Sequence, residues 1–308
     1  MAEKQTALWK RIIGYVTFSL FALVSMFFIT FPYDALKERL RIEADHAGYF
    51  VRIGSMGPGL FAVRASDVKI SKKSDADPPP EALVVDALSI GPSLSPLGVK
   101  VKAGLLGGTV VARVGALGAP RFKLDAEGLD LTRGNLKGFS GVDFSGAIEA
   151  HVDLTLPRTS AGANAPAEPD LSQASGSINL STRALTINGG TANIAIPQFG
   201  PEPTPVDLPK IAFGDLSGKL SIEKGAATVD KLDTHSDDLE LEVTGTIKLA
   251  KKVDYCEPQL EVRFKPDSEF QKRLGILGSA LSIVPADPKD PAWRKGKLTG
   301  YLSRPQFR

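Results

Sequence analysis

The 308-residue chain is long enough to bury a large hydrophobic core, and its composition is that of a folded protein. Its 37 Lys and Arg residues against 35 Asp and Glu residues give a formal charge of +2, and beyond the first 30 residues the two kinds are equal in number. A neutral body without a basic block argues against nucleic acid as a partner, because binding to phosphates requires clustered Lys and Arg. The single cysteine, Cys256, excludes an intramolecular disulfide and a cysteine-based zinc site.

The first predicted element is a membrane-spanning helix over residues 12–31, IIGYVTFSLFALVSMFFITF. The segment contains no charged residue, and a helix of this length crosses the hydrocarbon layer of a bilayer, which is about 30 Å thick. Basic residues precede the segment, and aromatic residues stand near both of its ends, as is typical of interfacial positions. The side chains that we expect to anchor it in lipid are Ile12, Phe18, Phe21, Leu23, Phe27 and Phe31.

A cleaved signal peptide is the alternative interpretation, because the segment is N-terminal and follows positive charge. The apolar run is longer than the usual signal core, and FFITFPYD contains no small residues at cleavage spacing, so an uncleaved signal anchor is favoured. Basic residues are balanced on the two sides, so charge alone leaves the orientation open. An early anchor usually translocates the long domain behind it, which predicts a cytoplasmic tail over residues 1–11 and a β-rich domain outside the cytoplasm over residues 32–308.

A short juxtamembrane helix is predicted over residues 33–48, because Leu36, Leu40 and Ala44 share one face and Gly48 suits a C-terminal stop. Beyond it the apolar period changes from about 3.6 to 2, which is the spacing of strands with one buried face. Because strands buried on both faces would give continuous apolar runs, we expect an antiparallel sheet.

The three clearest strands are AIEAHVDLTL (147–156), DLELEVTGTIKL (238–249) and QLEVRFK (259–265). Their apolar positions form a candidate groove or core face, which consists of Ile148, Val152, Leu154, Leu239, Leu241, Val243, Ile247, Leu249, Val262 and Phe264. The alternation suits a filled core and an open groove for acyl chains equally well, so the sequence leaves both interpretations open.

An amphipathic helix is predicted over residues 267–284, with Asp267 or Ser268 as its N-cap. Its apolar stripe should cover the apolar face of the sheet or plug its end. A closing strand follows over residues 295–304, and Pro305 should end its ladder because proline has no N–H to donate. The Pro-rich connections do not force a domain boundary, so one elongated domain is expected.

Catalytic and metal-binding motifs are missing from the sequence. His46, His151 and His235 are far apart and lack the spacing of zinc ligands. The carboxylates of THSDDLELE (234–242) lack the pattern of an EF-hand loop. No P-loop or nucleophile elbow occurs either. The protein is therefore expected to be no enzyme and to carry no cofactor, metal or catalytic residue.

A Gly-polar-aliphatic pattern opens several strands, as in GSINL at Gly176, GKLSI at Gly218, GTIKL at Gly245 and GKLTG at Gly296. Together with the anchor ending in FP, the segments GSMGPGLFAVRASDVKI and LDLTRGNLKGFSGVDFSGAIEAHVDL, and the closing KLTGYLSRPQF, these motifs resemble the type II secretion system protein N family. That family belongs to the wider group of AsmA-like envelope proteins. The resemblance extends over essentially the whole chain.

The resemblance implies a mainly β protein with a single N-terminal transmembrane helix and an elongated, curved antiparallel sheet. It implies residence in the inner membrane of a Gram-negative bacterium, with the body in the periplasm. The implied function is a non-enzymatic component or accessory factor of type II protein secretion, with the lipid bilayer and other secretion components as partners. Because AsmA-like relatives form groove-like sheets that handle lipids, the alternative is a lipid-binding or lipid-shuttling protein with an apolar groove.

Overall fold

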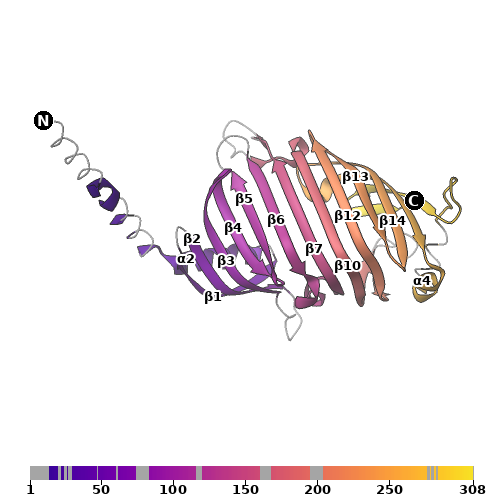
Figure 1. Ribbon diagram of the computed structural model, residues 1–308, viewed down its shortest axis with the longest axis horizontal. Helices are drawn as coiled ribbons and strands as arrows, with labels where there is room; N and C mark the ends of the chain where they lie inside the picture. The colour runs from indigo at the N-terminus through magenta and orange to yellow at the C-terminus, as the bar shows by residue number, and fades with distance from the viewer. Residues whose placement is uncertain are drawn as a thin grey trace.

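The computed structural model describes residues 14–19, 22–23, 26, 30–46, 48–59, 62–73, 83–115, 120–159, 168–194, 204–275, 278, 281 and 284–307. In these ranges the chain is mainly β, and one open antiparallel sheet of 15 strands dominates it (Figure 1). The strands stand in the sheet in the order of the sequence from β1 to β17, except that β11 pairs with β10 beside this path and that β8 and β9 form a small sheet of their own. The expected antiparallel β body is confirmed.

The bounds of the strands follow the sequence alternation. The strands are β1 (Tyr49–Gly59), β2 (Ala62–Lys72), β3 (Leu83–Leu94), β4 (Leu97–Leu105), β5 (Gly108–Gly115), β6 (Arg121–Asp130), β7 (Val142–Thr155), β8 (Arg158–Thr159), β9 (Glu168–Pro169), β10 (Ser175–Ile194), β11 (Thr204–Leu208), β12 (Ile211–Glu223), β13 (Ala226–His235), β14 (Leu239–Lys248), β15 (Glu257–Pro266), β16 (Arg294–Tyr301) and β17 (Arg304–Phe307).

Two-residue hairpins join several neighbouring strands. Leu106 and Gly107, between β4 and β5, have φ values of 52° and 73°, and Lys224 and Gly225, between β12 and β13, have φ values of 47° and 79°. Two consecutive positive φ values are the mark of a type I′ turn, whose twist matches that of the strands it connects. The sheet is therefore a meander, in which consecutive strands are neighbours and local turns or longer connections join them.

The sheet bends toward one face. The connection between β6 and β7 contains η1 (Leu131–Arg133) and α3 (Lys137–Ser140), and α3 contacts β2 although four strands lie between β2 and β7. The backbone N–H of Asp130 also donates to the carbonyl of Leu106, at 3.0 Å. At the other end, the yellow C-terminal strands pass behind β12–β14 in Figure 1. The body is thus a curved sheet, as expected.

The helix α2 (Tyr33–His46) precedes the sheet and packs against β1. Its Leu40 contacts the buried cluster of Ile53, Ala65, Val68 and Val85, which lies on the apolar side of β1–β3. A further helix, α4 (Ser268–Arg273), starts where the side chain of Asp267 accepts a hydrogen bond from the N–H of Glu269, at 2.8 Å. The predicted helix over residues 267–284 is shorter than expected, because α4 ends at Arg273 and the chain turns at Leu274 and Gly275, the latter with a φ of 56°. Several of the later residues of that prediction lie outside the described ranges.

Within the described ranges, the structure contains no helix that is long and apolar enough to cross a bilayer. The predicted anchor over residues 12–31 lies partly outside these ranges, and with it Ile12, Phe21 and Phe27. Phe18 and Leu23 are described and exposed, and Phe31 is half-buried. The membrane anchor therefore stays a prediction.

The C-terminus differs from the strand expected over residues 295–304. β16 ends at Tyr301, and the chain turns back to form β17, in which Pro305 lies opposite Gly300. Pro305 therefore does not end the ladder as predicted. A proline is tolerated there because β17 is the edge strand, so one side of its backbone needs no donor for a further neighbour.

The turn at Gly225 provides a test of the hairpin geometry. A Cβ atom on Gly225 would lie 2.0 Å from the carbonyl oxygen of Ser172, whereas a Cβ on Gly48, with a similar φ of 82°, would meet nothing within 4 Å. Gly225→Ala should lower the free energy of unfolding by about 1–3 kcal/mol more than Gly48→Ala, because only the first substitution adds overpacking to the positive-φ strain. Urea unfolding followed by circular dichroism measures the difference. Equal losses for the two variants would contradict the turn geometry.

Candidate functional site: an apolar trough

One face of the sheet carries an unbroken row of aligned residues. The register places each member of the row opposite the next one, so that a single line crosses the whole sheet. In order from β1 to β17, the row consists of Pro58, Val63, Ile90, Val101, Ala112, Leu124, Val152, Ile178, Leu220, Val229, Gly245, Leu260, Leu298 and Phe307. Every member is apolar or glycine. We call this face of the curved sheet the apolar trough.

The residues predicted for the groove or core face all belong to the trough or adjoin it. Leu241 pairs with Phe264 and Val243 with Val262, which joins β14 to β15. Ile148, Val152 and Leu154 lie on β7, and the row connects them to β14 through β10, β12 and β13. Leu249 lies just after β14 and packs on the buried cluster around Leu154. The structure thus brings sequence-distant candidates onto one surface.

The trough is only partly filled. Of the ten predicted residues, only Leu154, Val243 and Phe264 are buried, and the others are half-buried. Toward one rim, the side chains of Val99 and Val114 are paired across β4 and β5 and are 47% and 44% exposed. A filled protein core leaves apolar side chains dry, so the half-buried side chains of the trough are less covered than those of a closed core.

Short elements cover the trough at its ends. Leu40 of α2 packs over β1–β3, and the β6–β7 connection reaches over the β4–β5 turn, where a Cβ on Gly134 would meet the side chain of Leu106. At the other end, Phe270 and Leu274 of α4 pack on Ile211 of β12. Between these covers, the main contacts of the described strands are with their neighbours in the sheet.

At the C-terminal end of the trough, an open apolar hollow of about 400 Å³ lies beside α4. It is lined by Ile211 and Phe213 of β12, Phe264 of β15 and Phe307 of β17, among other residues. The ring of Phe307 lies over Gly296, where a Cβ would be 2.3 Å from the ring, and is 6.4 Å from the ring of Phe264. Because residues of β12 and β17 line the same hollow although β13–β16 lie between these strands in the sheet, the sheet is bent here.

The opposite face of the sheet is polar and carries ladders of ion pairs. Arg121 binds Asp153 through two hydrogen bonds of 2.8 and 2.7 Å, and Lys123 adds a third contact at 3.1 Å. Arg113 and His151 meet at Asp125, with distances of 2.6 and 3.2 Å. These pairs join β5, β6 and β7 across the strand direction. They hold the register that aligns the trough on the other side.

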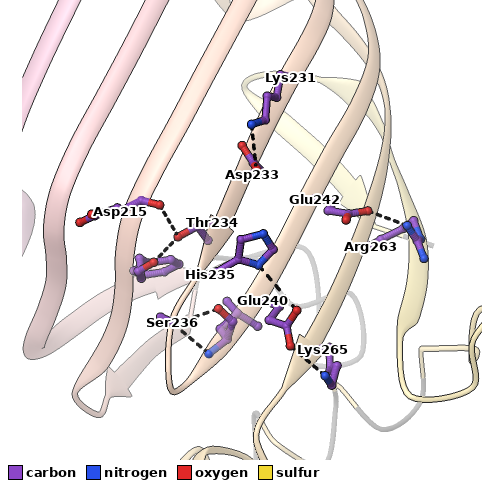
Figure 2. Close-up of polar contacts among 12 residues, drawn as sticks. Asp215, Lys231, Asp233, Thr234, His235, Ser236, Glu240, Glu242, Arg263 and Lys265 are labelled. Atoms are coloured by element: carbon purple, nitrogen blue, oxygen red, sulfur yellow. Dashed lines mark hydrogen bonds and ion pairs between the residues drawn. The ribbon is translucent and has the colours of Figure 1, made fainter.

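The ladder continues over β13–β15 (Figure 2). Lys265 binds Glu240 at 2.8 Å, Arg263 binds Glu242 at 2.5 Å, and His235 lies 3.6 Å from Glu240. Figure 2 also shows Thr234, whose hydroxyl donates to the backbone carbonyls of Phe213 and Asp215 at the bulge in β12. Each of these contacts joins neighbouring strands among β12–β15, so together they stabilise this part of the sheet.

Arg263 is the centre of the most enclosed polar cluster. Its Nε atom donates to Asp287 at 2.6 Å, its guanidinium lies 5.0 Å from the ring centre of Trp293, and Asp287 is only 3% exposed. The N–H of Lys289 donates to Asp287 at 2.9 Å and, together with Arg263, holds the pKa of this carboxyl below its ordinary value. Asp287 in turn raises the pKa of Arg263. The cluster fastens residues 287–293 to β15.

Hydrogen bonds from neighbouring cations lower the pKa of two carboxyl groups in the β5–β7 ladder. Arg113 is the main cause at Asp125, and Arg121 is the main cause at Asp153. Both carboxylates are ionised at neutral pH and serve as acceptors. Across the described residues, no group of three or more His, Cys, Asp and Glu side chains is arranged to hold a metal ion.

Sequence reasoning missed half of the trough. The strands β1–β6 show weaker alternation in sequence. The face of the sheet on which residues such as Ile90 and Ala112 lie is evident only from their cross-strand partners. It also missed Ile211 and Phe213, since IAFG has no clear alternation. The sequence shows weaker alternation around Val68, Val99, Phe122 and Ile178, which indicates strands, but it does not show that these strands share one apolar face with β7, β14 and β15.

Comparisons of the chain with protein-family models, with curated proteins and with solved structures found no match.

The Asp287 cluster predicts an acid-sensitive contribution to stability. Because the folded-state pKa of Asp287 is depressed, the contribution is present above the ordinary value of 3.8 and is lost as the pH falls through the folded-state pKa. Asp287→Asn should therefore lower the melting temperature at pH 7 and reduce its fall between pH 5 and about pH 2. Thermal melts followed by circular dichroism over this range measure both effects.

The matched control is Asp237→Asn, which changes an exposed carboxyl between β13 and β14. It should leave the melting temperature and its pH dependence as in the parent protein. An Asp287→Asn variant with an unchanged acid profile would contradict the role of this contact.

Proposed function

We propose that this protein is a non-enzymatic lipid-binding protein that holds acyl chains along the apolar trough. The observation that supports the proposal is the row of aligned apolar residues from β1 to β17, many of which stay half-buried. Contiguous exposed apolar surface of this extent is uncommon in proteins that bind nothing, and it marks a binding surface. An extended groove suits an extended hydrocarbon chain.

The energetics are favourable for such a ligand. Burial of hydrocarbon contributes about 0.8 kcal/mol for each CH₂ group, so about ten groups in the trough would supply about 8 kcal/mol before the costs of association. The trough needs no specific polar contact to achieve this, because the hydrophobic effect is non-directional. Lateral movement of a chain along the row would change its binding energy little. These properties suit a protein that carries or shuttles lipids.

We place the protein in the inner membrane, anchored by residues 12–31 with the β body in the periplasm. The apolar run and its aromatic flanks support the anchor, and the long domain behind an early anchor supports the orientation. The bilayer would then be the source of the acyl chains. Because α2 follows the anchor directly and packs on β1, the N-terminal end of the trough would lie next to the membrane.

A second candidate function is that of an accessory component of type II secretion. The resemblance of the sequence motifs to the protein N family supports it, and so does the edge strand β17, whose four residues are all exposed. An unpaired strand edge is a surface to which a strand of another protein can add. In this proposal the β body is a platform for other secretion components.

The lipid-binding proposal predicts a loss of bound lipid when the trough is made charged. Val99→Glu places a carboxylate on the trough at a position that is already 47% exposed, so the fold should tolerate it. The variant should retain less phospholipid than the parent chain when both are purified in a mild neutral detergent and analysed by native mass spectrometry. A charge in the groove must be desolvated before a hydrocarbon chain can cover it.

The matched control is Lys102→Glu, on the polar face of the same strand, β4. It should retain as much lipid as the parent chain. Absence of bound lipid from the parent chain, or equal lipid in Val99→Glu and the parent, would contradict the proposal.

The secretion proposal predicts that a clean deletion strain exports less of its secreted enzymes into the medium, while their periplasmic precursors accumulate. Enzyme activity in the culture supernatant and in the periplasm measures this. In the parent strain, which contains the protein, protease added to spheroplasts should digest the β body of the chain. Unchanged secretion would contradict the accessory role, and a protected body would contradict the periplasmic location.

A further inference from the structure

A cleft with a surplus of positive charge lies between α2 and the first two strands. It has a volume of about 600 Å³, and its charged lining consists of Lys37, Glu38 and Arg41 of α2, Arg52 of β1, and Asp67 and Lys69 of β2. The four cations exceed the two carboxylates. The chain beyond the first 30 residues, with the cleft included, has equal numbers of basic and acidic residues, so this local excess is a distinct feature.

The two carboxylates leave most of this charge available. Arg41 lies 3.7 Å from Glu38 and Lys69 lies 3.7 Å from Asp67, and the side chains in both pairs are largely solvent-exposed. Exposed pairs at such distances contribute little free energy. Within the described ranges, Lys37 and Arg52 form no ion pair at all. The cleft can therefore accept an anion without breaking a strong contact.

The cleft also has an apolar side. Phe50 is 54% exposed and lies on the same face of β1 as Arg52, whose register partner is Lys69. An exposed aromatic ring beside several cations is typical of protein surfaces at the membrane–water boundary. Lys37 lies one helical turn after the start of α2, and α2 begins two residues after the predicted anchor.

We propose that this basic cleft binds the phosphate-containing headgroup of an anionic phospholipid. The inference rests on the proposed membrane anchor and deepens the proposed function, because it names the class of lipid at the membrane end of the trough. Lys37 and Arg52 contact the phosphate, and Arg41 and Lys69 supply further positive charge. Val51 and Ile53 lie between the cleft and the trough on β1, so acyl chains of the bound lipid reach the apolar face nearby.

The test uses the full chain in a neutral maltoside detergent and two short-chain, water-soluble lipids. Isothermal titration calorimetry measures the affinity for dihexanoyl phosphatidylglycerol, which is anionic, and for dihexanoyl phosphatidylcholine, which is neutral. The double variant Lys37→Gln/Arg52→Gln should bind the anionic lipid about 30-fold more weakly, because each cation near an anionic lipid contributes about 1 kcal/mol. Its affinity for the neutral lipid should be unchanged.

The matched control is Lys102→Gln/Lys219→Gln, which removes two exposed cations from β4 and β12 outside the cleft. It should bind both lipids as the parent chain does. Added sodium phosphate should compete weakly with the anionic lipid. Equal binding of the anionic lipid by the cleft variant and the parent would overturn the proposal, as would inorganic phosphate that binds as tightly as the lipid.

Failure of this inference is distinguishable from failure of the proposed function. If both lipids bind equally, are unaffected by the cleft variant and are weakened by Val99→Glu, the trough binds acyl chains and the headgroup site is wrong. If neither lipid binds the parent chain, the lipid-binding function itself is wrong.

Discussion

The register between neighbouring strands places an apolar side chain opposite another apolar side chain from one edge of the sheet to the other, and the rest of the structure depends on this alignment. A shift of one residue between any two strands would move the apolar set of one strand to the polar face. The ion pairs of the polar face oppose such a shift. Arg121 with Asp153 and Arg263 with Glu242 bind only when the strands that carry them are correctly paired.

A single sheet with one apolar face has to shield that face from water. Sandwich proteins do so with a second sheet. Here the sheet bends toward its apolar side, and short elements cover the ends of the trough. α2 covers part of β1–β3, and α4 and Phe307 line the C-terminal hollow. The middle of the trough keeps apolar side chains that are only half-buried, which favours a ligand over a filled core.

The two faces of the sheet therefore have separate roles. The polar face stabilises the fold through lateral ion pairs, and the apolar face is available for binding. The basic cleft lies where the sheet begins, beside the predicted anchor, and the open apolar hollow lies where the sheet ends. In the proposed function, the anionic headgroup of a lipid binds in the basic cleft and its flexible chains lie along the apolar trough. A strand-edge partner at β17 would bind without blocking the trough, so the two proposed functions are compatible in one molecule.

The prediction of the candidate site from sequence depended on how strictly each strand alternates. Leu239, Leu241 and Val243 alternate with acidic residues, so their common face was predictable from β14 alone. Ile211 and Phe213 belong to β12, where polar and apolar residues alternate less clearly. The hollow that they line is formed only because the sheet bends and α4 packs beside it. Pro305 was misassigned because proline ends an internal strand but is tolerated in an edge strand, and nothing local in the sequence shows where the edge lies.

The sequence by itself determined the β character of the body, the antiparallel pairing and the amphipathic faces of its clearest strands, because alternation and turn residues are local properties of the chain. It also predicted the start of α2 and narrowed the N-cap of α4 to Asp267 or Ser268, of which the structure shows Asp267. Only the tertiary structure decided that the apolar faces join into one continuous trough, that the trough is partly open, and that α2 and β1 enclose a basic cleft. These features depend on register, curvature and coverage, which arise from contacts between residues far apart in the chain.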